Sequence, residues 1–378
     1  MIYLDNSATT TNKPAEMREA MLRSLELGNP GRGLSESALD AARSVFETRK
    51  KMAEFFGGKI NRTVFTYNAT HSLNLALLGL ISPGDRVLSS YYEHNSVLRP
   101  LYSLEASGVN LKLFKPEGLS ISLEDIKNNL EDDTRAVVLT HSSNVLGGLT
   151  QVREIGQYLR EKGLLFILDA SQTAGVFPIN IEEDFIDALC FTGHKTLMGP
   201  QGTGGLILSE RAEPKAVFSG GTGMFSFEKG MPSHLPDRLE AGTLNGVGIA
   251  GLGGSLDYLK KVDIDLLRKK EQDLALDFYD GAKDIDGIKI YSERPEKGAA
   301  IVTLNIGDMD SGHVSDLLTR CYSIATRPGA HCAPLVHELL GTVEQGAVRF
   351  SFSSYNNKEE VAAALEALKE ISAYRNED

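Results

Sequence analysis

Cysteine is scarce in this sequence. The 378 residues include three cysteines, Cys190, Cys321 and Cys332. An odd and sparse set does not build a disulfide framework, and it is typical of a protein in a reducing compartment. The opening residues, Met1 to Asp5, lack the charged segment and the apolar stretch of a signal peptide. We therefore expect a cytoplasmic protein.

Long apolar runs and clusters of basic residues are absent as well. No apolar run approaches the roughly 18 residues of a transmembrane helix, so no membrane span is expected. Lysine and arginine number 39 against 51 aspartates and glutamates, which gives a formal net charge of −12. A chain of this charge repels nucleic-acid backbones and anionic membranes, so neither is an expected partner.

Two common kinds of ligand site are also missing. The eight histidines show no metal-ligand spacing with carboxylates or cysteines, so no metal is expected. No G-x-G-x-x-G motif follows the first strand of a predicted βαβ unit, which argues against a Rossmann nucleotide-binding fold.

Short apolar runs, many of them β-branched, alternate with amphipathic segments between about residues 62 and 208. Strands that are covered on both faces have this composition. The runs predict strands at Thr63–Thr66, Arg86–Ser89, Val109–Phe114, Arg135–Thr140, Leu164–Leu168, Asp187–Phe191 and Gly204–Leu208. Ser122 and Asp125 resemble a capping box, and Val152–Lys162 predicts a helix that ends at Gly163. The alternation indicates an α/β fold with a mostly parallel sheet.

The pattern changes near residue 255. A glycine-rich, irregular region precedes this point, and 42% hydrophobic content over this length is enough for two domains. Beyond it we predict a charged helix, two short strands and a final helix, at Asp263–Ala282, Ile288–Tyr291, Ala300–Ile306 and Lys358–Ser372. We therefore expect a large domain over residues 15–254. A smaller α+β domain over residues 255–378 would also include residues 1–14.

A lysine and an aspartate stand at the ends of predicted strands. Lys195 follows the strand that ends at Phe191, and a desolvated lysine there can form a Schiff base with an aldehyde. By itself such a lysine is more often a solvated loop residue. Asp169 ends an apolar strand, where it either pairs with a cation, such as a protonated pyridine nitrogen, or caps a helix.

Two further motifs follow strands in the same way. Asn68 to Ser72 lies between a strand and an apolar helical run, and the start of such a helix suits a phosphate. His94 follows the strand at Arg86–Ser89 and can lie flat on a heterocycle or ionise. Each motif has an ordinary alternative, a helix cap for the first and a hydrogen-bonded polar residue for the second.

Cys332 differs from the other two cysteines in its setting. It lies in a predicted loop, Arg327 to Pro334, beside a histidine and an arginine. A solvent-reachable thiol near positive groups can act as a nucleophile. Cys190 lies within a predicted strand, and Cys321 lies among residues that suggest packing, so both are expected to be inert.

In this order, the motifs resemble the class V aminotransferase family of fold-type I enzymes that use pyridoxal 5′-phosphate (PLP). More narrowly, they resemble cysteine desulfurases and selenocysteine lyases. The resemblance runs from Tyr3–Thr10 to Arg349 and beyond. It implies a PLP-dependent transferase-like fold.

The resemblance also assigns the cofactor site. It implies that Lys195 binds the PLP aldehyde, Asp169 pairs with the pyridine nitrogen and His94 stacks on the ring. Asn144 and Gln172 lie near the phenolic oxygen. The phosphate is held by Ala69, Thr70, Thr192 and His194. Thr243 resembles a residue that reaches the phosphate site of the neighbouring subunit, which implies a homodimer.

The reaction implied by the resemblance is the conversion of L-cysteine to L-alanine. Arg349, together with Asn144, binds the substrate carboxylate, for which a guanidinium is well suited. Cys332 attacks the substrate sulfur, becomes a persulfide and passes the sulfur to an acceptor, such as a protein of iron–sulfur assembly. Lys195, Cys332, His94 and Asp169 are the expected catalytic residues.

Other reactions use the same PLP site and stay open. They are a selenocysteine lyase, a C–S lyase that releases sulfide, and an aminotransferase; a catalytically idle homologue that acts as a binding partner is a further alternative. The loop at Cys332 resembles the second of two desulfurase types, although Pro328 and Ala330 depart from its usual sequence. The opening residues resemble the first type, and His71 stands where a glutamate is usual.

Overall fold

A mostly parallel sheet forms the centre of the larger part of the protein. The computed structural model describes residues 1–30 and 35–374. Within them the sheet has seven strands in the order β2-β8-β7-β6-β5-β3-β4, and β8 alone runs against its neighbours. The strands are β2 (Thr63–Thr66), β3 (Arg86–Ser90), β4 (Asn110–Phe114), β5 (Thr134–Thr140), β6 (Leu165–Asp169), β7 (Ala188–Thr192) and β8 (Gly204–Leu208). The prediction of an α/β fold with these strands is confirmed.

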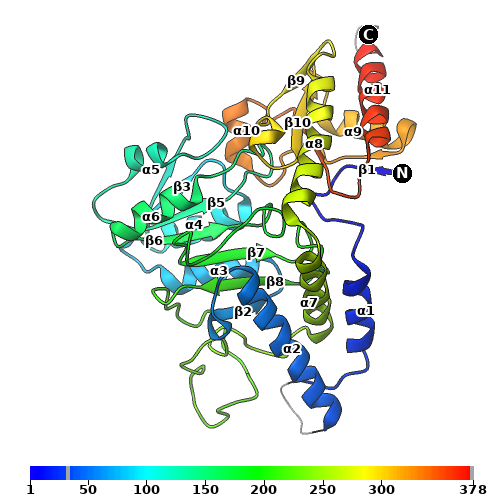
Figure 1. Ribbon diagram of the computed structural model, residues 1–378. Coiled ribbons are helices and arrows are strands. Elements are labelled where there is room, and N and C mark those ends of the chain that lie inside the picture. The colour runs from blue at the N-terminus through cyan, green and yellow to red at the C-terminus, as the bar shows by residue number, and fades with distance from the viewer. Residues whose placement is uncertain (31–34, 375–378) are drawn as a thin grey trace.

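Helices cover both faces of this sheet, which explains why its strands are apolar throughout. Phe166 and Leu168 of β6 pack on one face with residues of α2, α6 and α7, whereas Ile167 packs on the other with α3 and α4. The two groups of helices lie on opposite sides of the strands (Figure 1). The helices of this part are α1 (Ala15–Ser24), α2 (Glu36–Phe55), α3 (Ala69–Leu80), α4 (Asn95–Ala106), α5 (Leu123–Asn129), α6 (Val152–Glu161) and α7 (Gly246–Lys261), with a short 3-10 helix at Ile60–Arg62.

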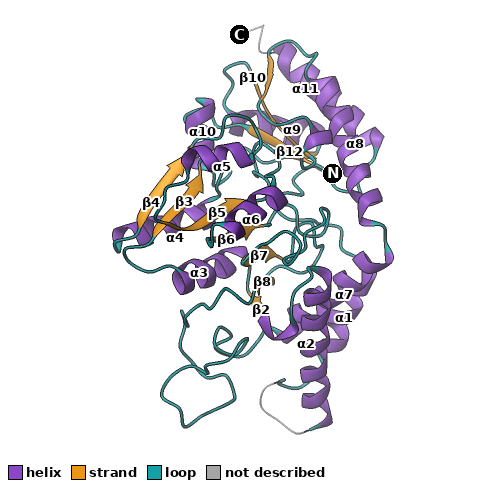
Figure 2. Ribbon diagram, turned by 60° about the vertical axis from the view of Figure 1, so that its left-hand side comes forward, coloured by secondary structure: helices purple, strands orange, loops and turns teal. Residues whose placement is uncertain are grey.

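A smaller unit with its own core lies above the large sheet (Figures 1 and 2). Its antiparallel sheet has the order β12-β10-β9, and β1 pairs in parallel with β11. The elements are β1 (Ile2–Tyr3), α8 (Ile264–Ala282), β9 (Ile288–Ile290), a 3-10 helix (Pro295–Lys297), β10 (Ile301–Ile306), α9 (Ser311–Tyr322), β11 (Ile324–Ala325), α10 (Pro334–Leu340), β12 (Val348–Ser351) and α11 (Lys358–Tyr374). The predicted division at residue 255 falls inside α7, so the domain limits stay a prediction.

Most local sequence signals describe the chain correctly. The capping box of Ser122 and Asp125 opens α5, and Gly163 follows α6 with a φ of 75°. The connection between β8 and α7 is long and irregular, as the glycines predict, and it projects from the body of the molecule (Figure 2). It ends earlier than predicted, because α7 begins at Gly246 and its glycines pack in a helix. In the described part of the chain, no helix is long and apolar enough to cross a membrane.

Candidate active site

Lys195 and Asp169 lie at the same edge of the large sheet because their strands are parallel. Asp169 is the last residue of β6, and it pairs in register with Thr140 of β5 and Cys190 of β7. Lys195 follows the end of β7 by three residues. The carboxyl ends of parallel strands are the usual place for a ligand site in such sheets.

The Lys195 amine is partly buried and, within the described residues, makes no hydrogen bond or ion pair. Burial, and then the charge of Arg349, lowers the pKa of this amine to about 8, while Asp169 opposes the shift. The N-terminal segment holds the lysine loop in place, since the Thr10 hydroxyl donates to the Lys195 carbonyl at 3.1 Å. The loop is therefore fixed while the amine stays free to react.

Asp169 is almost fully buried, with an exposed fraction of 3%. Its Oδ1 accepts hydrogen bonds from the Ser171 amide at 3.0 Å and from the Ser171 hydroxyl. Burial raises the pKa of the Asp169 carboxyl, and the charge of Lys195 opposes that effect. Residues 170–173 form a turn rather than a helix, so the helix-cap interpretation of Asp169 is wrong.

His94 is held as a neutral ring. It is the N-cap of α4, and its Nδ1 accepts a hydrogen bond from the Ser96 amide at 3.0 Å. That bond leaves the proton on Nε2. Burial, and then the positive charge of Lys195, lowers the pKa of His94 to about 4. The ring is therefore both the cap of α4 and a neutral neighbour of the Lys195 amine.

The residues predicted to hold a phosphate lie at the start of α3 and after the end of β7. Ala69 and Thr70 are its first two residues, and Thr70 shares a hydrogen bond of 2.7 Å with Ser96, beside His94. Thr192 ends β7 and is buried, and His194 follows it. The Nδ1 atom of His194 is buried and, within the described part of the chain, has no hydrogen-bond partner.

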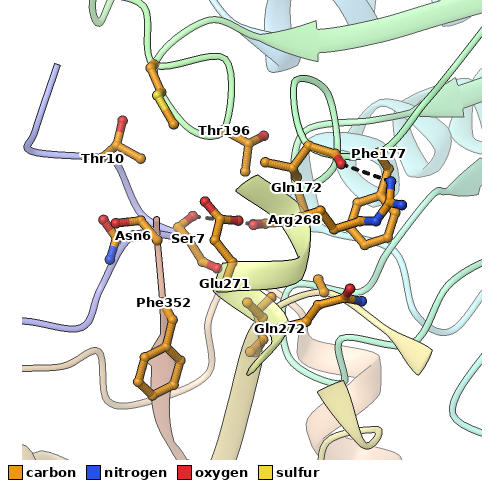
Figure 3. Close-up of a pocket in the computed structure, with 16 residues that line it drawn as sticks. Asn6, Ser7, Thr10, Gln172, Phe177, Thr196, Arg268, Glu271, Gln272 and Phe352 are labelled. Atoms are coloured by element: carbon orange, nitrogen blue, oxygen red, sulfur yellow. Dashed lines mark hydrogen bonds between the residues drawn. The ribbon is translucent and has the colours of Figure 1, made fainter. Parts of the chain in front are cut away.

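Gln172 and Thr243 differ in where they lie. The Gln172 amide donates to the Ser7 carbonyl at 3.3 Å, beside a narrow cavity where the N-terminal segment, the large sheet and α8 meet (Figure 3). Thr243 is exposed on the connection between β8 and α7. The depression that Thr243 lines contains none of the residues around Lys195, whereas its neighbours Gly242 and Leu244 line a second depression together with Thr70.

Arg349 connects the two sheets. It lies in β12 with no exposed surface, its Nη2 pairs with Asp5 Oδ1 at 2.9 Å, and its Nη1 donates to the Asn144 carbonyl at 3.1 Å. Its Nε is buried and finds no partner among the described residues. A guanidinium suits a carboxylate, and a buried donor without a partner is a group that such a ligand would satisfy.

Cys332 lies on a constrained loop next to His94 and Asn144. Its backbone has a φ of 57°, and the preceding residue, His331, has a φ of 52°. The Cys332 carbonyl accepts from the Asn95 amide at 2.7 Å, next to His94, and the Arg327 side chain lies 3.8 Å from the sulfur. The Asn144 side-chain amide donates to the His331 carbonyl at 2.8 Å, and the Asn144 backbone carbonyl accepts from Arg349, so one residue joins the Arg349 site to the cysteine loop.

A family model decides the relationship of this chain to known proteins. The model of class-V aminotransferases matches residues 2–364. The chain belongs to the class-V aminotransferase family. The predicted family and the fold-type I fold are therefore confirmed.

Members of this family that resemble the chain carry a common description. It is 33% identical over 380 residues to a probable cysteine desulfurase of Methanothermobacter thermautotrophicus, covering 98% of this chain and 94% of that protein. It is 29% identical over 396 residues to a cysteine desulfurase of Haloferax volcanii, covering 99% and 90%. The structure of an apo cysteine desulfurase from Thermococcus onnurineus superposes with a TM-score of 0.90 at 32% identity, covering 98% and 94%.

Four residues near the candidate site were not predicted from the sequence as site residues. Asp5 pairs with Arg349, Ser96 bonds to both His94 and Thr70, and Arg327 approaches the Cys332 sulfur. Glu93 is fully buried under the site, and burial raises the pKa of its carboxyl to about 8. Glu93 precedes His94 in the sequence, and Arg327 lies in the cysteine loop, so their positions could have identified both as site residues. Asp5 and Ser96 carried none.

Proposed function

We propose that this protein is a PLP-dependent cysteine desulfurase that converts L-cysteine to L-alanine and retains the sulfur on Cys332. The single observation that carries the proposal is the link between two sites. The loop of Cys332 is bonded to Asn95, beside His94, and to Asn144, which also contacts Arg349. A thiol is therefore held beside a lysine–aspartate site and an arginine suited to a carboxylate.

The free polar groups of the site fit PLP. The unpaired amine of Lys195 would react with the aldehyde, and the buried carboxylate of Asp169 would pair with the pyridine nitrogen. The first amides of α3, at Ala69 and Thr70, and the unpartnered Nδ1 of His194 suit the phosphate. His94, Asn144, Gln172 and Thr192 would complete the site. When bound, PLP supplies an electron-withdrawing ring that stabilises negative charge on the substrate Cα.

The protein's own residues then divide the work. Arg349 orients the substrate by its carboxylate, and Asn144 fixes the position of the guanidinium. With a pKa of about 8, roughly a tenth of the Lys195 amine is neutral at pH 7, far more than for an ordinary lysine, so its Nζ can accept the proton from Cα and return it. Asp169, although burial raises its pKa, is ionised when it faces a cationic nitrogen.

Cys332 carries out the sulfur transfer. Its thiolate attacks the substrate sulfur, a sulfur–sulfur bond forms, and the bond between that sulfur and the substrate Cβ breaks. The electron pair of the broken bond stays on Cβ, which takes up a proton to become the methyl group of L-alanine. The thiolate sulfur is oxidised to a persulfide and Cβ is reduced, so the step balances. Because Cys332 is exposed, an acceptor protein can reach the persulfide.

We also propose a homodimer in which Thr243 reaches the partner's phosphate site. Four large apolar side chains are exposed on the same connection between β8 and α7: Phe218, Met224, Phe225 and Phe227. Several large apolar side chains exposed on one segment favour a protein contact. A partner that covers this connection would also bury Thr243, which supports its assignment.

The proposal is tested with purified protein supplied with PLP. The wild-type protein should show the visible absorbance of lysine-bound PLP, and Lys195→Ala should not. With L-cysteine and a reducing thiol, alanine and sulfide should form in equal amounts. Formation of pyruvate and sulfide in place of alanine would indicate another lyase. Formation of a keto acid that retains the sulfur would indicate an aminotransferase. Absence of bound PLP in the wild type would contradict the proposal.

A further inference from the structure

A chain of hydrogen bonds runs through the protein behind the Cys332 loop. The Thr342 hydroxyl lies 2.8 Å from His337 Nδ1, and His337 Nε2 lies 3.2 Å from His331 Nδ1. His331 Nε2 lies 3.0 Å from the Arg327 carbonyl oxygen. Both imidazoles are buried, and their rings stack with centroids 5.4 Å apart. The chain therefore joins the start of the cysteine loop to the end of α10.

The direction of every bond in this chain follows from one end. The Arg327 carbonyl can only accept, so His331 carries its proton on Nε2 and accepts at Nδ1. His337 must then donate from Nε2 and accept at Nδ1. The Thr342 hydroxyl supplies the last proton. Burial lowers the pKa of both imidazoles, while the Thr342 backbone opposes this effect at His337, so both rings are neutral near neutral pH. In this arrangement each of the three bonds has one donor and one acceptor.

The chain acts on a backbone that is unfavourable by itself. His331 and Cys332 are consecutive non-glycine residues with positive φ, a strained conformation that persists only where the surrounding structure holds it. Asn144 and Asn95 fix the His331 and Cys332 carbonyls. The hydrogen bonds of the His331 ring fix the remaining part of this residue, its side chain.

We propose that His337 is a positioning residue for Cys332, acting through His331. It does not touch the substrate or the lysine site, and it fixes the His331 ring so that the loop presents the Cys332 sulfur to the substrate. The inference deepens the proposed function and rests on Cys332 as the sulfur acceptor. It predicts that the chain matters for sulfur transfer and not for proton transfer by Lys195.

Paired variants test this division. His337→Leu keeps an apolar side chain of similar size but removes both bonds, whereas His337→Gln keeps an N–H donor toward His331. Thr342→Val and Thr342→Ser form a second pair, without and with the hydroxyl. Each is made with Cys321→Ser, because Cys321 is not packed, as its neighbours in the sequence suggested, but is the other exposed thiol in the described part of the protein.

Two rates are compared in each variant. One is alanine formation from L-cysteine in a single turnover, which requires Cys332. The other is exchange of the Cα proton of L-alanine in deuterated water, which requires Lys195 and not Cys332. His337→Leu should slow the first rate about tenfold or more and leave the second within about twofold, and His337→Gln should recover most of the loss. Thr342→Val should show a smaller loss that Thr342→Ser does not.

The tautomers are measured separately, by nitrogen NMR of protein labelled at histidine and free of PLP. His331 and His337 should both be neutral, with the proton on Nε2. A proton on Nδ1 of either ring would overturn the inference, as would equal losses of both rates in His337→Leu or no rescue by glutamine. If the wild-type protein forms no alanine, the proposed function fails. The tautomers then still decide whether the chain of hydrogen bonds from Thr342 to Arg327 exists.

Discussion

Replacement of Arg349 gives the sharpest test of how the substrate is bound. Arg349→Gln removes the buried guanidinium, whose Nε is unpartnered in the described structure and whose Nη2 faces Asp5. A hydrogen bond to a charged group contributes about 1.5–3 kcal/mol, which corresponds to roughly ten- to 150-fold in affinity. We therefore expect the Kd of L-alanine, measured by titrating the absorbance of bound PLP, to rise by that factor. The Kd of ethylamine, which lacks the carboxylate, should change by less than about threefold.

A matched variant separates binding from structure in this experiment. Asp5→Asn breaks the same ion pair but keeps the guanidinium, so the preference for L-alanine over ethylamine should persist. Thermal unfolding of both variants shows whether either has lost stability. Equal weakening of L-alanine and ethylamine in Arg349→Gln would refute the assignment, because a carboxylate contact cannot affect an amine without a carboxylate.

Three further outcomes follow from the site. The rate at which the cofactor-free protein binds PLP should rise about tenfold per pH unit below pH 8 and level off above it. The reason is that only the neutral Lys195 amine reacts, and burial lowers the pKa of this amine to about 8. A rate that still rises at pH 10 would contradict the lowered pKa. Asp169→Asn should bind PLP but exchange the Cα proton of L-alanine roughly ten- to 150-fold more slowly, since a neutral amide loses a charged hydrogen bond to the pyridine nitrogen; an unchanged exchange rate would refute that contact. Thr243→Glu should weaken PLP binding in the dimer by placing a carboxylate near the partner's phosphate, whereas Thr243→Ser should not, and equal PLP affinities would remove Thr243 from that site.

Local patterns in the sequence predict much of the fold. Strands such as β6 are buried on both faces, so every residue of a run such as Leu164–Leu168 is apolar. That composition alone predicts a strand. Helix ends are equally local, since a capping box or a glycine with positive φ acts within a few residues. Lys195 and Asp169 could be placed together because both follow parallel strands, whose ends meet at one edge.

Contacts between distant segments could not be predicted in this way. The pair of Asp5 and Arg349 spans 344 positions, and the bond from Asn144 to His331 spans 187. No local pattern encodes either contact, because each depends on how the smaller unit sits on the large sheet. His331 and His337 are six residues apart, a spacing that no regular element brings together, and the turn into α10 makes them neighbours.

One measurement tests the central claim most directly, namely that Cys332 receives the sulfur. The PLP-loaded protein is mixed with L-cysteine in the absence of a reducing agent and then digested with a protease. The masses of the peptides that contain cysteine are measured by mass spectrometry. We predict that the Cys332 peptide gains the mass of one sulfur atom in proportion to the alanine formed, and that the Cys190 and Cys321 peptides do not. Alanine formation at an undiminished rate in Cys332→Ser, or extra sulfur on another cysteine, would contradict the account.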